Sequence, residues 1–520
     1  MNGFKLIIVL SIIFSCPFFS FSQFGYYDDV TRFGQNFSLG TTRIQSLGGI
    51  NTSIGGDISS ISGNPAGLGF FNSNYFSMTI NSSKSESSSN FNNETSTSSN
   101  NNFGLDNFGL VYSLGKNSTK NNCSDCVKFN LGVGYNKVND FKESVYYAGY
   151  NNSNSIIDYF LNQSQGIPLS QLGSSSSLSG FEIIQEAYDH YLINPNPSLE
   201  DNYYSFVAGF PYQQETITNQ GNQYKLSFSI GANYQDNVFF GVGLSFNSIF
   251  FQQNRSYIEN QFEIFENEKW ISENILDYLE VNDRLETIGS GISGSLGMII
   301  KPTPSINFGI SYKTKTNYKL KEESGSNLYS NYFDYYFAPE DTLLSYVESA
   351  TQTISTNYNL IIPGTLSLGT TFFIDKYGFI SADIDFINYS YSKINSENSF
   401  DPYLDNEAIA DIYRPASNFR IGAEGRFKKV FYVRMGFQYL GNPYDKDLEY
   451  MNQLDKSSSV RSFGIGFMKN KFSIDIAYRN EKKRDRFSPY NFGGVLRPIA
   501  KTNYNKNSII ISLGFKLTNN

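Results

Sequence analysis

The sequence is poor in the residues that build metal and catalytic sites, since its 520 residues include one His, three Cys and one Trp. Structural zinc normally takes four Cys or His ligands, so we expect no metal site and no cofactor. Charged residues make up only 17% of the chain, and the net charge of −8 argues against a nucleic-acid partner. No long apolar run follows residue 22, which excludes transmembrane helices.

The N-terminal segment predicts export from the cytoplasm. Lys5 provides a basic start, residues 6–19 are apolar, and small residues follow at a suitable cleavage position. These are the parts of a secretory signal peptide, which we assign to residues 1–22. The apolar residues directly after Cys16 argue against a lipoprotein anchor at that cysteine.

Aromatic and small residues are abundant. Phe, Tyr and Gly number 46, 38 and 43, a composition that favours strands joined by turns. In fourteen segments, apolar residues alternate with Gly, Ser and polar residues, as expected of strands with one apolar face. These segments lie near residues 74–82, 108–114, 127–141, 223–235, 238–252, 286–301, 306–320, 353–373, 378–390, 417–427, 430–440, 462–468, 472–479 and 506–517.

The connections between these segments alternate in length, with short turns after the even-numbered strands. Short turns on one side and long loops on the other are typical of outer-membrane barrels, in which the sheet must close to pair its backbone. We therefore predict an all-β fold, a 14-stranded antiparallel transmembrane β-barrel over residues 70–520 with long, partly helical extracellular loops. The long connections are 83–102, 142–222, 254–284, 321–350, 391–416, 441–460 and 480–505.

Charged residues of the later strands fall opposite the apolar face. A Lys or Arg facing lipid would cost about 2–4 kcal/mol at the membrane midplane. We expect these side chains to point into the lumen and to pair across strands, as a structural network or as a guide for a substrate. They are Asp383, Asp385, Arg420, Glu424, Arg434, Asp475, Arg479 and Lys516.

One stretch ahead of the strands does not alternate. Residues 42–68 read TRIQSLGGINTSIGGDISSISGNPAGL, in which two Gly-Gly pairs limit any helix to short pieces. Pro65 suits the first turn of a helix that Asn64 caps. We interpret residues 23–69 as a compact N-terminal plug, or hatch, small enough to sit inside the barrel.

This stretch resembles the N-terminal hatch signature of the FadL/TodX family of outer-membrane transporters, and fourteen strands after a hatch are that family's architecture. Residues 155–160, 187–193 and 420–424 are more weakly similar to its Bacteroidota branch. The resemblance implies passive uptake of long-chain fatty acids or aromatic hydrocarbons, which loops capture, a lumen pocket holds and a hatch movement releases. The hatch positions that the resemblance marks for ligand binding or movement are Gly48, Gly49, Gly55, Gly56, Asp57, Asn64, Pro65 and Ala66.

The third predicted strand contains two glycines with two interpretations. In the family that the hatch resembles, an inward kink in this strand opens a gap in the wall toward the membrane. Gly132 and Gly134 are candidates for that kink, because Gly inside a strand often marks a bend or bulge. Alternatively, both glycines face the lumen and make room for the plug.

The long loops are not purely polar. Apolar residues recur at helical spacing in 155–162, 181–193 and 270–279, which predicts amphipathic helices there. Such helices outside a barrel pack on one another, over the mouth or on a hydrophobic ligand. The Ser- and Asn-rich segment 82–102 is predicted to be a solvated loop.

The remaining motifs carry little chemistry. Cys123 and Cys126 are candidates for a local disulfide, which is the usual state of such a pair in an oxidising periplasm. Residues 289–294 have the glycine spacing of a dinucleotide-binding motif. That motif must lead into a helix, whereas these residues lead into a predicted strand, so we reject a dinucleotide site here. His190 has no marked partner nucleophile, so we expect no catalytic residues and no enzyme.

Two hypotheses for function remain. The first is a channel for hydrophobic small molecules or lipids in the outer membrane of a Gram-negative, Bacteroidota-like bacterium. The second is an accessory barrel subunit of a larger outer-membrane complex for secretion or barrel assembly, in which the lumen is closed and the loops hold partners.

Overall fold

The structure is a computed structural model. It describes residues 25–35, 40–114, 127–172, 182–199, 201–266, 269–396, 399–445, 455–490 and 497–517. The predicted signal peptide, 1–22, and the candidate disulfide, Cys123 and Cys126, lie outside these residues.

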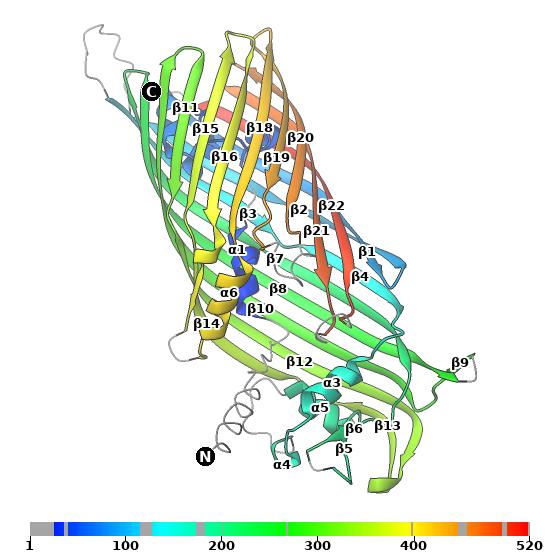
Figure 1. Cartoon of the computed structure of the whole chain (residues 1–520). Coiled ribbons are helices and arrows are strands. Elements are labelled where there is room, and N and C mark those ends of the chain that lie inside the picture. Colours follow the sequence, from blue (N-terminus) through cyan, green and yellow to red (C-terminus); the bar gives the residue numbers. More distant parts are fainter. Residues whose placement is uncertain are drawn as a thin grey trace, which may run out of the picture.

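The strands form one antiparallel sheet that closes on itself, because the last strand pairs with the first from Asn74↔Leu517 to Asn90↔Lys501. This confirms the 14-stranded barrel (Figure 1). In order around the wall the strands are β1 (Asn74–Phe91), β2 (Glu94–Ser113), β3 (Val127–Asp140) with β4 (Glu143–Tyr150), β7 (Phe210–Tyr234), β8 (Val238–Glu266), β10 (Leu276–Thr303), β11 (Ile306–Lys313) with β12 (Thr316–Phe337), β14 (Gln352–Ile362) with β15 (Thr365–Ile374), β16 (Gly378–Asn388), β18 (Pro415–Phe427), β19 (Phe431–Leu440), β20 (Ser458–Lys469), β21 (Phe472–Phe487) and β22 (Ala500–Leu517).

Helices and short strands lie inside the barrel or at its long-loop end. The N-terminal segment contains η1 (Tyr26–Asp28), α1 (Asp29–Gly34), α2 (Thr42–Ser46), η2 (Ile58–Ile61) and η3 (Pro65–Phe70). The loops contain α3 (Ile156–Ser164), α4 (Leu169–Leu172), α5 (Glu182–Asp189), β5 (Asn194–Pro195), β6 (Tyr203–Tyr204), β9 (Lys269–Ser272), η4 (Ala338–Glu340), β13 (Thr342–Glu348), η5 (Tyr389–Tyr391), β17 (Lys393–Asn395) and α6 (Tyr403–Ile412). No helix among the described residues is long and apolar enough to cross a membrane.

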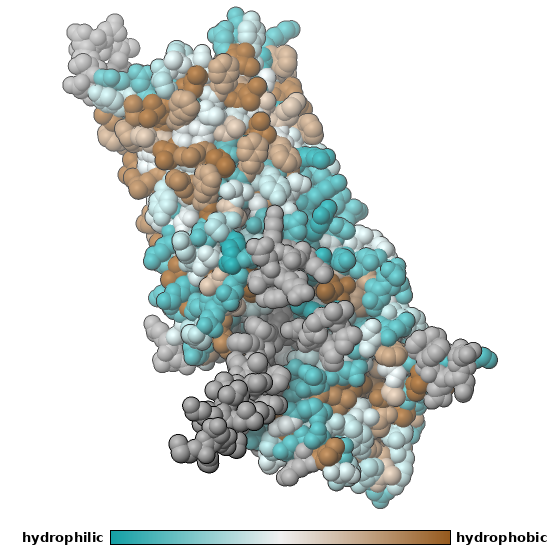
Figure 2. Space-filling model, viewed as in Figure 1, coloured by the Kyte–Doolittle hydropathy of each residue, from teal (hydrophilic) through white to brown (hydrophobic). Residues whose placement is uncertain are grey.

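Apolar side chains gather at the end of the barrel that carries the short turns and form a belt there, whereas the visible surface of the other half is mostly polar with scattered apolar patches (Figure 2). Phe463, Tyr478 and Ile509, for example, are 57%, 47% and 57% exposed on neighbouring strands. Such exposure of large apolar residues is costly in water and favourable in lipid. The belt therefore marks the part of the wall that a membrane would cover.

The charged residues of the later strands point inward, as predicted. Glu424 accepts from Arg434 at 2.8 Å, Arg434 pairs with Asp475 at 2.6 Å, and Arg420 pairs with Asp385. All of these side chains except the half-buried Asp475 are buried, so each charge depends on its partner. Lys516 is the exception among the predicted set, because it is exposed at the rim.

Strands extend into most of the predicted long loops, including 254–284, 321–350 and 480–505. The Ser- and Asn-rich segment 82–102 continues β1 and β2, which pair up to Phe91↔Glu94 around a turn at Asn92 and Asn93. Both turn residues have positive φ, which fits a two-residue hairpin. Its small polar side chains suit an extension of the wall into water, in which β1 also pairs with β22 as far as Asn90 and alternation of apolar residues is not needed.

Residues 270–279 contain no helix, contrary to the helical spacing of their apolar residues. They contribute the end of β9 and the start of β10, which pairs with both β8 and β12. Hydrogen bonds to both neighbouring strands satisfy the polar groups of the β10 backbone. This stabilisation outweighs the helical spacing of the apolar residues. The other two predicted loop helices are present, as α3 and α5, and they pack in one apolar cluster with Leu276 and Leu328.

Candidate functional site

The part of the hatch that follows α1, residues 40–70, folds into three short helices inside the belt end of the barrel (Figure 1). Each helix has a side-chain cap, which explains how such short helices persist. Thr41 accepts from the backbone N–H of Ile44, Asp57 accepts from Ser59 at 2.9 Å, and Asn64 accepts from Ala66 at 3.1 Å. Pro65 occupies the first turn after Asn64, as the sequence predicts.

The two Gly-Gly pairs form the turns of the hatch. Gly48, Gly49, Gly55 and Gly56 have φ of 72°, 81°, 63° and 69°, in the left-handed region that favours Gly. A Cβ on Gly48 would also lie 2.7 Å from the backbone of Phe437 in β19. All four positions therefore need Gly for their conformation, and Gly48 needs it for space as well.

Glycines of the wall meet the hatch at distances that allow no side chain. A Cβ on Gly241 would lie 2.2 Å from the Pro65 backbone, and one on Gly297 would lie 1.8 Å from Asn64. Glycines in comparable contact with hatch atoms are Gly109, Gly132, Gly231, Gly309, Gly422, Gly436 and Gly464. The inward face of the wall thus fits closely around the hatch.

Polar side chains of the wall hold the hatch backbone. Asp383 accepts from the backbone N–H groups of Asn51 and Thr52 at 2.8 and 2.9 Å. Arg43 of α2 joins the hatch to the luminal charges, since its Nε lies 3.1 Å from Glu424 and its Nη1 lies 3.9 Å from Asp57. The hatch is therefore fixed by specific polar contacts as well as by fit.

Between the hatch and the loops, the lumen holds an apolar cluster that we call the chamber. Its wall consists of buried residues of β8, β10, β12, β14 and the segment around α6. Val30 and Phe33 of α1 insert into it and are fully buried. The chamber residues are Val30, Phe33, Phe141, Ile249, Phe251, Leu285, Tyr318, Leu320, Tyr358, Leu360, Ile362, Ile387, Tyr389, Ile394, Ile409, Ile412, Tyr413, Ala416 and Tyr444.

The wall is discontinuous where β3 ends. Pairing of β2 with β3 runs from Ser113↔Asn130 to Asn107↔Asn136 and no further along the described strands. The continuation, β4, lies on the inner side of neighbouring strands, because Ser87 of β1 donates to the Ser144 carbonyl at 2.8 Å and Lys483 of β21 pairs with Glu143 at 2.5 Å. We call this separation of β2 from β3 and β4 the seam.

The bend falls after the two glycines that the sequence marked for it. Gly132 and Gly134 are paired on both sides in regular register, and the register shift lies between Lys137 and Asn139. Both glycines face Ile61 of the hatch, at 2.7 and 3.3 Å from a Cβ on each. Both glycines therefore lie in the regularly paired part of β3 against the hatch, and the register shift begins three residues after Gly134.

A buried ion pair lies at the inner edge of the seam. Lys137 Nζ is 3.0 Å from Asp106 Oδ1, and both side chains are almost fully buried. Asp106 also accepts from Gln45 of the hatch at 3.2 Å and from Asn81 of β1 at 2.9 Å. Sequence reasoning missed this group, although an Asp inside the apolar segment FGLDNFGL was an available signal.

No protein-family profile matches the chain, and no curated protein matches its sequence. Among solved structures, a FadL homologue of Pseudomonas aeruginosa is similar at 13% identity and a TM-score of 0.53, over 92% of this chain and 99% of that one. A deltaS2 mutant of the monoaromatic hydrocarbon channel TodX is similar at 13% identity and a TM-score of 0.51, over 93% of this chain and 99% of that one. The fold is that of FadL.

The FadL-type barrel brings His190 next to a hydroxyl group that the sequence did not indicate. His190 Nδ1 lies 3.0 Å from Ser330 Oγ, and the His190 carbonyl accepts from Tyr332 at 2.6 Å. Burial lowers the pKa of His190 to about 4, so the imidazole is neutral. Because His190 and Ser330 are both buried in the apolar loop cluster, a substrate has no access to the pair.

The loop end of this FadL-type barrel is organised around Glu259 of β8. Glu259 accepts from Ile156 and Gln213 at 2.8 Å, from Tyr257 at 2.6 Å, and from Ser155, which also caps α3. Burial raises the pKa of Glu259 to about 7, despite these four donors. The side chain thus attaches α3 to the barrel beyond the apolar belt.

Proposed function

We propose that this chain is an outer-membrane channel for the passive uptake of hydrophobic molecules, with long-chain fatty acids or aromatic hydrocarbons as cargo. The observation that carries the proposal is the chamber, an apolar cluster that fills the lumen and extends to the seam at Phe141. The apolar belt and the FadL fold support the location in the outer membrane.

In this proposal α1 occupies the ligand's place in the resting protein. Val30 and Phe33 present to the chamber the kind of surface that a hydrocarbon chain or aromatic ring would present. A ligand arriving from the loops replaces these contacts, so α1 must leave as the ligand enters. Because the apolar ligand replaces the apolar side chains of α1, the chamber stays filled, and the free-energy cost of displacing α1 is small.

The seam provides the exit. A hydrophobic molecule in the chamber is adjacent to the seam, where the pairing of β2 with β3 has ended. Leaving sideways into the membrane avoids transfer of the molecule into water. The hatch then closes the lumen to polar solutes, and its turns at Gly48, Gly49, Gly55 and Gly56 and the segment Asp57 to Ala66 carry any movement that accompanies release.

Uptake by cells tests this function directly. Cells with and without the protein are given labelled fatty acids and aromatic hydrocarbons, and initial uptake is followed with and without an uncoupler. We expect faster, saturable and uncoupler-resistant uptake of at least one class when the protein is present. Equal uptake with and without the protein across the panel would refute the proposal.

The accessory-subunit hypothesis retains one supporting observation, because the lumen is filled both at the hatch and at the chamber. A gentle detergent pull-down of the full chain discriminates between the two. Stoichiometric recovery with a large outer-membrane complex, combined with no uptake, would favour the subunit.

A further inference from the structure

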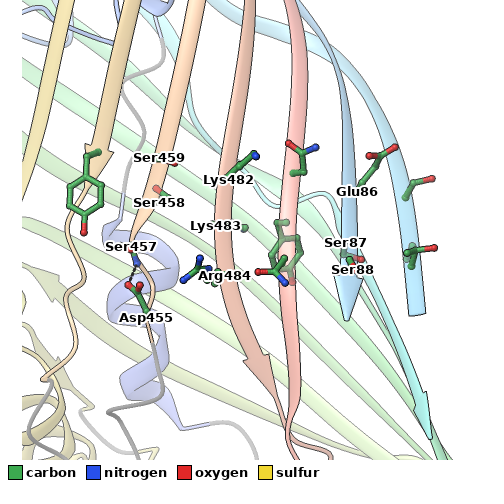
Figure 3. A pocket seen from close by; sticks show the side chains of 17 residues that line it. Glu86, Ser87, Ser88, Asp455, Ser457, Ser458, Ser459, Lys482, Lys483 and Arg484 are labelled. Carbon is green, nitrogen blue, oxygen red and sulfur yellow. Dashed lines mark hydrogen bonds between the residues drawn. The ribbon is translucent and has the colours of Figure 1, made fainter. Parts of the chain in front are cut away.

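A groove of about 920 Å³ lies on the wall formed by β20, β21, β22, β1 and β2, away from the chamber. Figure 3 shows these strands with α1 and the opposite wall behind them, so the view is from outside the barrel. The residues that line the groove are Glu86, Ser87, Ser88, Thr97, Ser98, Ser99, Tyr439, Asp455, Ser457, Ser458, Ser459, Lys482, Lys483, Arg484, Asn503, Tyr504 and Asn505.

Strand register shows that the groove faces outward. Lys482 pairs with Asn505, which pairs with Glu86, and the paired residues of neighbouring strands share a face. This row is exposed, whereas the adjacent row points into the lumen, where Lys483 meets Glu143 of β4. The side chains of the two outward-pointing rows form the sides of the groove. The backbone of the inward-pointing row between them forms its floor.

The groove has an excess of positive charge. Lys482 and Arg484 project from successive outward positions of β21, and neither forms an ion pair with another described residue. Of the two carboxylates, Glu86 pairs with Lys84 at 2.6 Å and Asp455 accepts from the backbone N–H of Ser457 at 2.9 Å. The two free cations are accompanied by hydroxyl and amide groups, which are further donors for an anion.

The groove begins just beyond the apolar belt. The outermost apolar row here contains Phe463, Tyr478 and Ile509, and Lys482 follows Tyr478 by four residues on β21. Four residues of strand span about 13 Å, or roughly 10 Å in height at the usual strand tilt. That height lies a few ångströms above the headgroup layer, which adds roughly 5–8 Å on each side of the hydrocarbon core, and the long Lys and Arg side chains can reach down to it. Figure 2 shows the same change from brown belt to teal surface over β21, β22 and β1.

We propose that this groove binds the phosphorylated headgroup of a lipid of the outer leaflet. Lys482 and Arg484 bind the phosphate, and the acyl chains of the same lipid lie on Tyr478 and Ile509 of the belt. A lipid can contact both parts of this surface, the apolar belt with its acyl chains and the two cations with its phosphate. A free anion can contact only the cations. The inference uses the outer-membrane location from the proposed function but is independent of the cargo.

The test measures lipid retained by the full-length protein in detergent, by native mass spectrometry, with bisphosphorylated lipid A and the same lipid after dephosphorylation. We expect the wild-type protein to prefer the phosphorylated form, and Lys482→Gln combined with Arg484→Gln to weaken its retention roughly tenfold or more. The matched control is Lys319→Gln combined with Lys321→Gln, which removes the same charge from the exposed face of β12.

Retention of phosphorylated lipid A by the double variant at the wild-type level would overturn the proposal, as would an equal loss in the control. Full displacement by inorganic phosphate would show an anion site without a lipid. Uptake measured on the same variants separates the two proposals, since we expect the double variant to keep uptake while it loses lipid retention.

Discussion

Phe33 of α1 packs edge-to-face on Phe141, which lies between β3 and β4, with ring centroids 5.9 Å apart and planes at 81°. Both rings also meet Phe251 of β8 edge-to-face, at 6.2 and 5.2 Å. The N-terminal helix in the lumen and the break in the wall therefore share one aromatic cluster. Whatever displaces α1 from the chamber also changes the packing at the seam.

Replacement of Phe33 by Ala should release α1. A fully buried Phe→Ala substitution costs about 3–5 kcal/mol, and here the loss falls on a short helix rather than on the barrel. We expect residues 26–34 to become accessible to protease and uptake to rise, while the barrel keeps its resistance to SDS. Phe427→Ala, at an exposed position of β18, is the control, and an effect of equal size there would contradict the account.

Arg43→Gln should loosen the hatch. The substitution removes the ion pair with Glu424, but Glu424 keeps Arg434 at 2.8 Å, so we expect a loss of about 1.5–3 kcal/mol in hatch stability. Single-channel recordings in planar bilayers should show more frequent openings. Lys321→Gln, which breaks the exposed pair with Glu323, should leave the recordings unchanged.

Gly241→Ala should disturb the hatch more than Gly425→Ala. The first Cβ would meet the Pro65 backbone at 2.2 Å, whereas the second meets only a Phe427 ring carbon at 3.6 Å. Overpacking of this kind costs about 1–3 kcal/mol. Hydrogen exchange of residues 57–70 should increase in the first variant alone, and equal exchange in both would count against the close fit.

Stability of the α3 region should decrease as the pH rises from about 4.5 to about 7. Glu259 titrates near 4.5 when unfolded, and burial raises its pKa to about 7 in the folded protein. Its contribution is therefore complete below the unfolded value and is lost as the pH passes the folded value. Hydrogen exchange of residues 155–164 across this range measures the effect, and Glu259→Gln should remove this component of the pH dependence.

Alternation of apolar and polar residues was sufficient to predict the barrel and its fourteen strands. It worked because lipid on the outside and polar groups on the inside impose a period of two on every strand. The pattern underestimated strand length wherever the strands continue into water. In 82–102, for instance, both faces are polar, so pairing is not visible in the residue types.

The chamber and the seam were harder to predict. Phe33, Phe141 and Phe251 are far apart in the sequence and look like ordinary aromatic residues, so only the closed barrel brings them together. The register shift within β3 begins at Lys137 rather than at a glycine, and Lys137 pairs there with the buried Asp106, where the ladder to β2 ends.

Occupation of the chamber by a hydrophobic ligand is the most direct test. A Phe141→Trp reporter in a Trp270→Phe background, purified in detergent, is titrated with brominated fatty acids and aromatic compounds. We predict saturable quenching of the reporter that an unbrominated analogue reverses, together with release of residues 26–34 to protease. Absence of saturable quenching across the whole panel would contradict the account, because the chamber would then hold α1 and nothing else.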